Sequence, residues 1–96
     1  MTEPYPKNVD GPFYIENNCC ITCGVPVEIA PELFSWDDDA EHPGHCYVSR
    51  QPRGGKEVDL VFEVLRHSEI NCLRYRGRKL LMLARLWAQG YSRQCD

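Results

Sequence analysis

The cysteines place the strongest constraint on how this chain can fold. Six of its 96 residues are cysteine, and three of them lie in the turn-forming stretch Asn17–Gly24. In a secreted domain such a density predicts a disulfide framework. The N-terminus, however, lacks the basic and then apolar pattern of a signal peptide, and no apolar run is long enough to span a bilayer. We therefore expect a cytoplasmic chain with no membrane partner, in which the cysteines are thiols or metal ligands.

The charge of the chain is distributed unevenly. Residues 1–72 contain 5 Lys and Arg against 13 Asp and Glu, whereas residues 73–96 contain 6 against 1. An acidic body binds nucleic acid poorly, because neutralising phosphates requires clustered cations. The basic tail offers only a scattered set for such a contact: Arg74, Arg76, Arg78, Lys79, Arg85 and Arg93. We therefore expect no nucleic-acid partner.

Periodicity and turn residues predict one domain of short elements. An N-terminal arm at 1–12 is rich in proline and turn formers. A domain at 13–77 follows, with strands at 13–15, 33–36, 46–48 and 73–76, a short helix between Pro26 and Pro31, and an acidic hairpin loop at 37–44. A longer helix is predicted at 56–67, because its apolar residues recur at i, i+3, i+4 and i+7: Val58, Val61, Phe62 and Leu65.

The last segment, residues 78–96, is predicted to add a helix at 78–92 that packs on the domain. Its expected core stripe consists of Leu80, Leu83, Ala84, Trp87 and Tyr91. Leu81, Met82 and Leu86 are apolar as well. A helix that is apolar over so much of its circumference has two surfaces to cover, and the second one makes a homodimer through this helix a hypothesis.

The motif Cys20-Ile-Thr-Cys23 carries the chemistry. Two cysteines with two residues between them can direct both sulfurs toward one point, as in zinc knuckles and iron–sulfur loops. Thioredoxin-like redox sites use the same spacing, but they require a long helix after the motif. Pro26 and Pro31 leave room for only a short helix here, which disfavours the redox alternative.

Residues 8–77 resemble small bacterial single-cluster ferredoxins. The resemblance rests on five stretches: Gly11-Pro12-Phe13-Tyr14-Ile15, Cys20-Ile-Thr-Cys23-Gly24, residues 27–34, Gln51-Pro52 and Arg74-Tyr75-Arg76-Gly77. It implies an α+β fold with two short antiparallel strand pairs and flanking helices. It also implies four cysteines around a four-iron cluster. Cys20 and Cys23 match the first two ligands, but the third position is Pro26 and the fourth is Ser68.

Two cysteines outside the ferredoxin pattern offer replacements. Cys46 and Cys72, together with Cys20 and Cys23, form a predicted tetrad that would hold zinc or, alternatively, a rearranged iron–sulfur cluster. Cys19 is an alternative to Cys20 as a ligand. Free cysteines are also common in cores, so Cys46 and Cys72 have a structural interpretation as small buried hydrophobes.

Other polar residues have simpler predicted roles. His42 and His45 flank Pro43-Gly44 in the hairpin loop and are alternative metal ligands, although loop histidines are commonly just polar. The run Asp37-Asp38-Asp39 lacks the spacing of a calcium loop and is expected to be a solvated turn. Cys95 is expected to be an exposed thiol at a frayed terminus.

No motif indicates catalysis. The chain has no phosphate-binding glycine loop, no nucleophile motif and no paired carboxylates in a context that would separate their pKa values. We therefore predict a non-enzymatic ferredoxin-like protein that has lost the usual cluster and binds a protein partner, such as a toxin for which it is the immunity protein. The acidic stretch Asp37–Glu41 and the tail helix are the expected contact surfaces. The alternative is an electron carrier that uses the rearranged tetrad.

Overall fold

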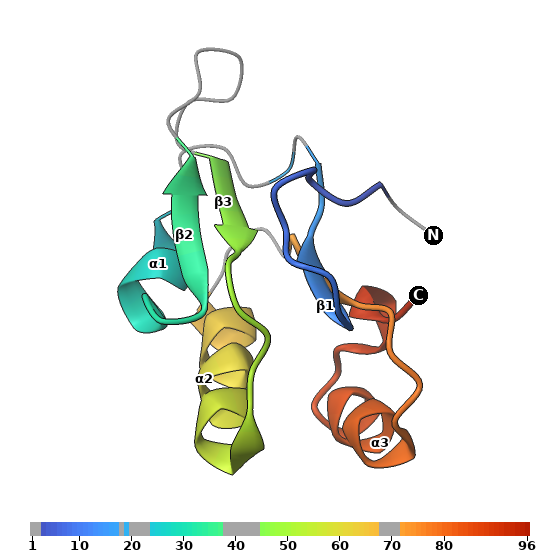
Figure 1. Ribbon diagram of the computed structural model, residues 1–96. Helices are drawn as coiled ribbons and strands as arrows, with labels where there is room; N and C mark the ends of the chain where they lie inside the picture. Colours follow the sequence, from blue (N-terminus) through green and yellow to red (C-terminus); the bar gives the residue numbers. More distant parts are fainter. Residues whose placement is uncertain (1–2, 18, 20–23, 38–44, 68–71) are drawn as a thin grey trace.

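The computed structural model describes residues 3–17, 19, 24–37, 45–67 and 72–96. Along the chain its elements are β1 (Phe13–Ile15), α1 (Val25–Ile29), β2 (Phe34–Asp37), β3 (His45–Val48), α2 (Gly54–His67), β4 (Leu73–Tyr75), α3 (Leu80–Ala88) and the 3-10 turn η1 (Ser92–Gln94). The strands form two antiparallel two-stranded sheets, β1–β4 and β2–β3 (Figure 1). The predicted small α+β fold with two strand pairs is confirmed.

The two sheets differ in how far apart their strands lie in sequence. In the β2–β3 hairpin, Trp36 lies opposite Cys46. In the other sheet the first and last strands pair, with Phe13 opposite Tyr75 and Ile15 opposite Leu73. Because β1 is the first strand and β4 the last, this pairing joins the two ends of the segment that contains α1, β2, β3 and α2. The ends of β1 and β4 therefore bring distant cysteines together.

The helices follow from local signals. Pro26 occupies the first turn of α1, where its missing N–H removes no helical bond, and the helix ends at Ile29 before Pro31. In α2 the predicted apolar face is buried through Val61, Phe62 and Leu65, with Val64 beside it. Glu57 in the first turn accepts the backbone N–H of Arg53 at 2.7 Å, which satisfies one of the donors left open at the start of α2.

The N-terminal segment is bound to the domain through Tyr5 and Asn8. The Tyr5 side chain is buried, and its backbone N–H donates to the carbonyl of Ile15 at 3.0 Å. The Asn8 amide donates to the carbonyls of Tyr5 and Ile15, and its Oδ1 accepts the backbone N–H of Val48 at 2.9 Å. One side chain thus connects the N-terminal segment, β1 and β3. The sequence predicted an extended arm for this segment. The burial of Tyr5 was not foreseen, because a single buried tyrosine leaves no periodic pattern in the sequence.

The tail helix is shorter than predicted, and its buried face is different. Helix α3 ends at Ala88 rather than at residue 92, and Gly90 turns the chain with φ +86, a conformation that favours glycine. Leu86 is the buried residue of α3, and Met82 and Leu83 are partly buried against the core. Leu80 and Trp87, which we assigned to the core stripe, are exposed. Periodicity could not choose between two apolar faces of one helix.

Candidate cysteine site

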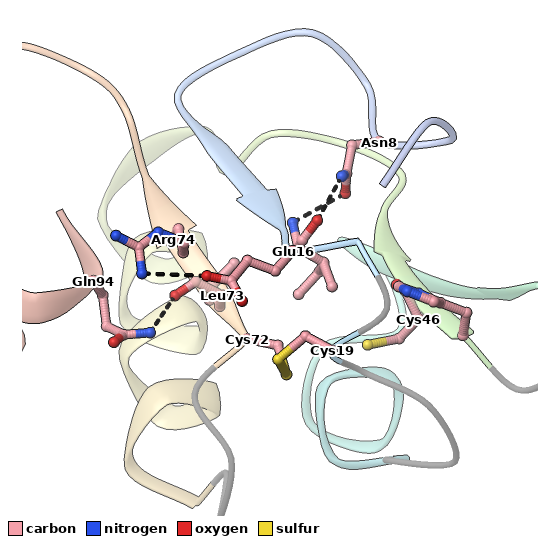
Figure 2. The surroundings of a disulfide bond; sticks show 10 residues. Asn8, Glu16, Cys19, Cys46, Cys72, Leu73, Arg74 and Gln94 are labelled. Atoms are coloured by element: carbon pink, nitrogen blue, oxygen red, sulfur yellow. Dashed lines mark hydrogen bonds and ion pairs between the residues drawn. A yellow bond between two sulfur atoms is a disulfide. The ribbon is translucent and has the colours of Figure 1, made fainter. Parts of the chain in front are cut away.

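A disulfide connects Cys19, in the segment after β1, to Cys72, immediately before β4 (Figure 2). The two residues are 53 positions apart in sequence, and the antiparallel β1–β4 pairing brings them together. Cys72 is buried at 4% exposure and Cys19 is half-buried, both against the hydrophobic core. The bridge therefore closes the end of the β1–β4 sheet where the cysteine-rich loop leaves it.

Cys46 lies close to this disulfide, on β3. Its side chain is fully buried in the same core and is directed toward the Cys19–Cys72 bridge (Figure 2). Cys46 is itself disulfide-bonded, and its partner lies outside the described residues. The sequence favoured thiols or metal ligands at Cys46 and Cys72 over disulfides, whereas both cysteines are disulfide-bonded in the structure; their predicted role as metal ligands stays a prediction. The expectation rested on the redox state of the cellular compartment. The fold, in contrast, decides which sulfurs lie within bonding distance of each other.

The predicted tetrad of Cys20, Cys23, Cys46 and Cys72 is only partly described. Cys20 and Cys23 lie outside the described residues, so their place relative to Cys46 stays a prediction. Cys72 pairs with Cys19, the residue that we considered as an exchange for Cys20. Within the part of the chain that the structure describes, no group of three or more His, Cys, Asp or Glu side chains is arranged to hold a metal ion.

The four-iron cluster of a ferredoxin does not fit the described residues. Pro26, where the sequence resemblance predicts the third ligand, is buried in the first turn of α1 and has no donor atom on its side chain. A sulfur in a disulfide is not a thiolate, so Cys72 and Cys19 must be reduced before either can bind iron. Ser68, where the resemblance predicts the fourth ligand, lies outside the described residues.

Hydrogen bonds stabilise the β4 side of the site. The backbone N–H of Glu16 donates to the carbonyl of Cys72 at 2.9 Å, which continues the β1–β4 pairing up to the disulfide. Arg74 on β4 forms an ion pair with Glu16 at 3.4 Å. The buried side chain of Gln94 donates to the carbonyl of Leu73 at 2.9 Å (Figure 2). Sequence reasoning missed Gln94, because a lone polar residue near a terminus carries no pattern.

His45 and Asp37 are buried in the structure, whereas we expected both to be exposed in the hairpin loop. The His45 ring is fully buried and stacks on Tyr5, with the ring centroids 3.7 Å apart. The carboxylate of Asp37 is 6% exposed, accepts a hydrogen bond from the Tyr5 hydroxyl and pairs with Lys7 at 3.1 Å. Asp37 therefore belongs to the hairpin's packed end and not to a solvated turn. His42 and residues 38–41 lie outside the described residues.

The C-terminal cysteine is not at a frayed end. The backbone of Cys95 forms an isolated bridge with Tyr75 of β4, and the N–H of Asp96 donates to the Tyr75 carbonyl at 2.9 Å. The Cys95 thiol is free and half-buried, and its burial raises the thiol's pKa above the usual 9.0. The expectation of an exposed thiol is corrected because the last residues form an additional strip beside β4.

Comparison with known proteins finds similarity to a ferredoxin. The chain is similar to a ferredoxin of Moorella thermoacetica, with 33% identity over 43 residues. That stretch is 45% of this chain and 65% of the ferredoxin, so the chain spans slightly less than two thirds of that relative. No protein-family model matches the chain. No solved structure matches it either. The similarity suggests a ferredoxin-like relationship and leaves the cofactor undecided.

The lengths and composition of the helices were compared with what a membrane-spanning helix requires. Among the described residues, no helix has both the length and the apolar character needed to cross a bilayer. The longest of these helices, α2, has one polar face and carries acidic and basic side chains in its first and last turns.

Proposed function

We propose that this chain is a non-catalytic ferredoxin-like protein in which disulfides replace the usual iron–sulfur cluster, and that it acts by binding a protein partner. The observation that carries the proposal is the bond between Cys19 and Cys72. It joins two strand ends that the α+β fold already brings together, and so it gives these cysteines a structural role. Pro26, buried in α1 where the third ligand is expected, supports the loss of the cluster.

The surface of α3 supports the binding role. Leu80 and Leu81 are 81% and 89% exposed, and Trp87 is 66% exposed. Side chains of this size are normally buried, and their grouping on one exposed helix is typical of an interaction site, which supports the proposal. Asp37, at one end of the acidic stretch that we also expected as a contact surface, is buried, and residues 38–41 lie outside the described residues. A partner such as a toxin, for which this chain would be the inhibitor or immunity protein, remains the proposed class.

An iron–sulfur electron carrier is the second candidate, and the similarity to the Moorella thermoacetica ferredoxin favours it. It requires the tetrad Cys20, Cys23, Cys46 and Cys72 to act as thiolates. The Cys19–Cys72 bond and the disulfide of Cys46 must therefore first each take up two electrons and two protons from a thiol reductant. The same reduced tetrad is the proposed site for zinc, which four thiolates suit.

Elemental analysis separates these alternatives. The chain is purified without oxygen, with and without a thiol reductant, and iron, zinc and acid-labile sulfide are measured together with free thiols. We expect no stoichiometric metal in the unreduced protein, in which the Cys95 thiol is free. Iron with a matching amount of sulfide would overturn the proposal in favour of the electron carrier. Zinc without sulfide in the reduced protein would support the tetrad as a structural metal site.

Two variants locate any metal that is found. Cys23→Ser removes a predicted ligand and is expected to abolish metal binding if the tetrad holds the ion. Cys95→Ser is the matched control, because Cys95 lies outside the tetrad, and it is expected to leave the metal content unchanged. A metal content that Cys23→Ser leaves unchanged would show that the metal is bound elsewhere, and an equal loss in both variants would contradict a site specific to the tetrad.

A further inference from the structure

Helix α3 has an exposed face that consists entirely of apolar residues. Besides Leu80, Leu81 and Trp87, it contains the exposed alanines Ala84 and Ala88. These positions follow the pattern i, i+1, i+4, i+7 and i+8, which places them on one side of a helix. The opposite side is used inside the domain, where Leu86 is buried and Met82 is partly buried. The second apolar face is therefore surplus to the fold of a single chain.

The domain holds α3 in a defined orientation. Arg85 pairs with Asp59 of α2 at 2.6 Å, and its guanidinium lies 4.2 Å from the centre of the Phe62 ring. Tyr91, just after α3, lies near the same ring, with centroids 6.2 Å apart. In Figure 1, α3 lies at an outer end of the molecule, with no other element drawn beyond it. An outward apolar face whose helix is already oriented by such contacts loses less conformational freedom on binding than one on a free segment.

We infer that the exposed face of α3 pairs antiparallel with the same face of a second copy of this chain. This inference rests on the protein-binding role proposed above and names the partner of its α3 surface. The face is self-complementary about Ala84, with Leu80 and Leu81 on one side and Trp87 on the other. In a two-fold pair each copy's leucines lie against the other copy's tryptophan, and the two small alanines let the helices approach closely.

The charges of the tail favour the antiparallel direction. Arg78 and Lys79 are exposed at the start of α3. In an antiparallel pair they lie beside the carbonyl end of the partner's helix, where a cation is stabilised. The two basic starts are then separated by about 14 Å, the length of a nine-residue helix, which exceeds the Debye length of about 8 Å at physiological salt. A parallel pair would place these cations side by side.

The exposed apolar area supplies a large part of a dimer interface of ordinary size. Two leucines and a tryptophan exposed to this degree present roughly 400–500 Å² per copy, and a standard interface needs about 800 Å² per partner. The three large side chains thus supply about half of the interface and form its apolar centre. Ala84, Ala88 and the flanks of α3 lie around them. A single copy would leave all of this surface in water.

Sedimentation velocity and light scattering on the full chain test the inference. We expect a mass of twice 11.1 kDa at high protein concentration, with dissociation on dilution. Ala84→Arg places a long cation at the centre of the face and is expected to raise the dimer dissociation constant by about a hundredfold, because the charge would be buried without a partner. Arginine is a good helix former, so the monomer's circular dichroism spectrum should be unchanged.

Glu28→Gln is the matched control. Glu28 is exposed on α1, and this substitution changes the net charge by the same amount as Ala84→Arg. It is expected to leave the dissociation constant unchanged. A wild-type chain that is monomeric at every concentration would overturn the inference, and so would a dimer that Ala84→Arg does not weaken. Iron and sulfide in a dimeric sample would overturn the proposed function alone, whereas a metal-free monomer would overturn this inference alone.

Discussion

The sulfur of Cys19, just after the first strand, is bonded to the sulfur of Cys72, just before the last strand. The bond closes a loop of 53 residues that contains α1, the β2–β3 hairpin and α2. It joins the same two strands that pair through the backbone in the β1–β4 sheet. The Cys19–Cys72 bond and the β1–β4 pairing therefore hold the same two strands together. Loss of the bond should lower the stability of the folded chain.

Removing this disulfide should destabilise the folded chain strongly. For a loop of 53 residues, the entropy regained by the unfolded chain corresponds to about 4 kcal/mol. The double variant Cys19→Ala/Cys72→Ala should therefore lose most of the free energy of unfolding of a small domain, measured by urea denaturation. Cys95→Ala, which removes a free thiol instead, should lose far less. Equal denaturation midpoints for the double variant and the wild type would contradict the structural role of the bond.

Acid should destabilise the chain through Glu57. The hydrogen bonds from Arg50, and then the backbone N–H of Arg53, hold the pKa of Glu57 below its usual 4.5. Because this pKa is lower in the folded than in the unfolded chain, its contribution is present above pH 4.5 and is lost as the pH falls through the folded-state pKa.

The variant Glu57→Gln provides the comparison. The difference in melting temperature between wild type and variant should be largest at neutral pH and should shrink as the pH is lowered through the acidic range. Thermal melting followed by circular dichroism at a series of pH values measures it. A difference that stays constant with pH would show that Glu57 contributes without its charge.

Cys95 should react slowly in the native protein. Its burial raises the thiol's pKa, so little thiolate is present at neutral pH, and the side chain is half-covered. Alkylation by iodoacetamide, followed by mass spectrometry of the Cys95 peptide, should be many times faster in urea than in buffer. Rapid labelling of the native chain would instead support a frayed terminus.

The two faces of α3 should respond differently to the same change. Leu86 is 1% exposed, so Leu86→Ala should cost about 2–5 kcal/mol through lost burial and the cavity left behind. Leu81 is 89% exposed, so Leu81→Ala should cost within about 0.5 kcal/mol. Both are measured by urea denaturation in the Ala84→Arg background, which is designed to keep the chain monomeric. A larger cost for Leu81→Ala than for Leu86→Ala would mean that α3 is bound to the domain by its other face.

Several features of the fold were readable from local sequence. Helix α2 was predicted from four apolar residues at helical spacing, and Val61, Phe62 and Leu65 are buried as expected. Helix α1 was predicted from Pro26 and Pro31, because proline acts on the backbone at its own position. The strands β1 and β3 are likewise where their short apolar runs predicted them. In each case the signal is contained within a few neighbouring residues.

The disulfide pairing of the cysteines could not be predicted from local sequence. Cysteine spacing indicated that the sulfurs would gather, but Cys19 and Cys20 are neighbours in sequence and spacing cannot tell which one meets Cys72. The β1–β4 register decides it by bringing the end of β1 to the start of β4. The buried positions of Tyr5 and Gln94 depend on the same long-range closure.

The sequence by itself determined the places of the helices, because periodicity and proline act locally, and its resemblance to ferredoxins led to the expected small α+β architecture. Only the tertiary structure decided that Cys72 bonds Cys19 and that Leu86, rather than Leu80 and Trp87, faces the core. A helix that is apolar on two sides can bury either one, and its neighbours in space choose between them. Here Arg85 contacts Phe62 and Asp59 of α2, which is consistent with the side of α3 that is buried.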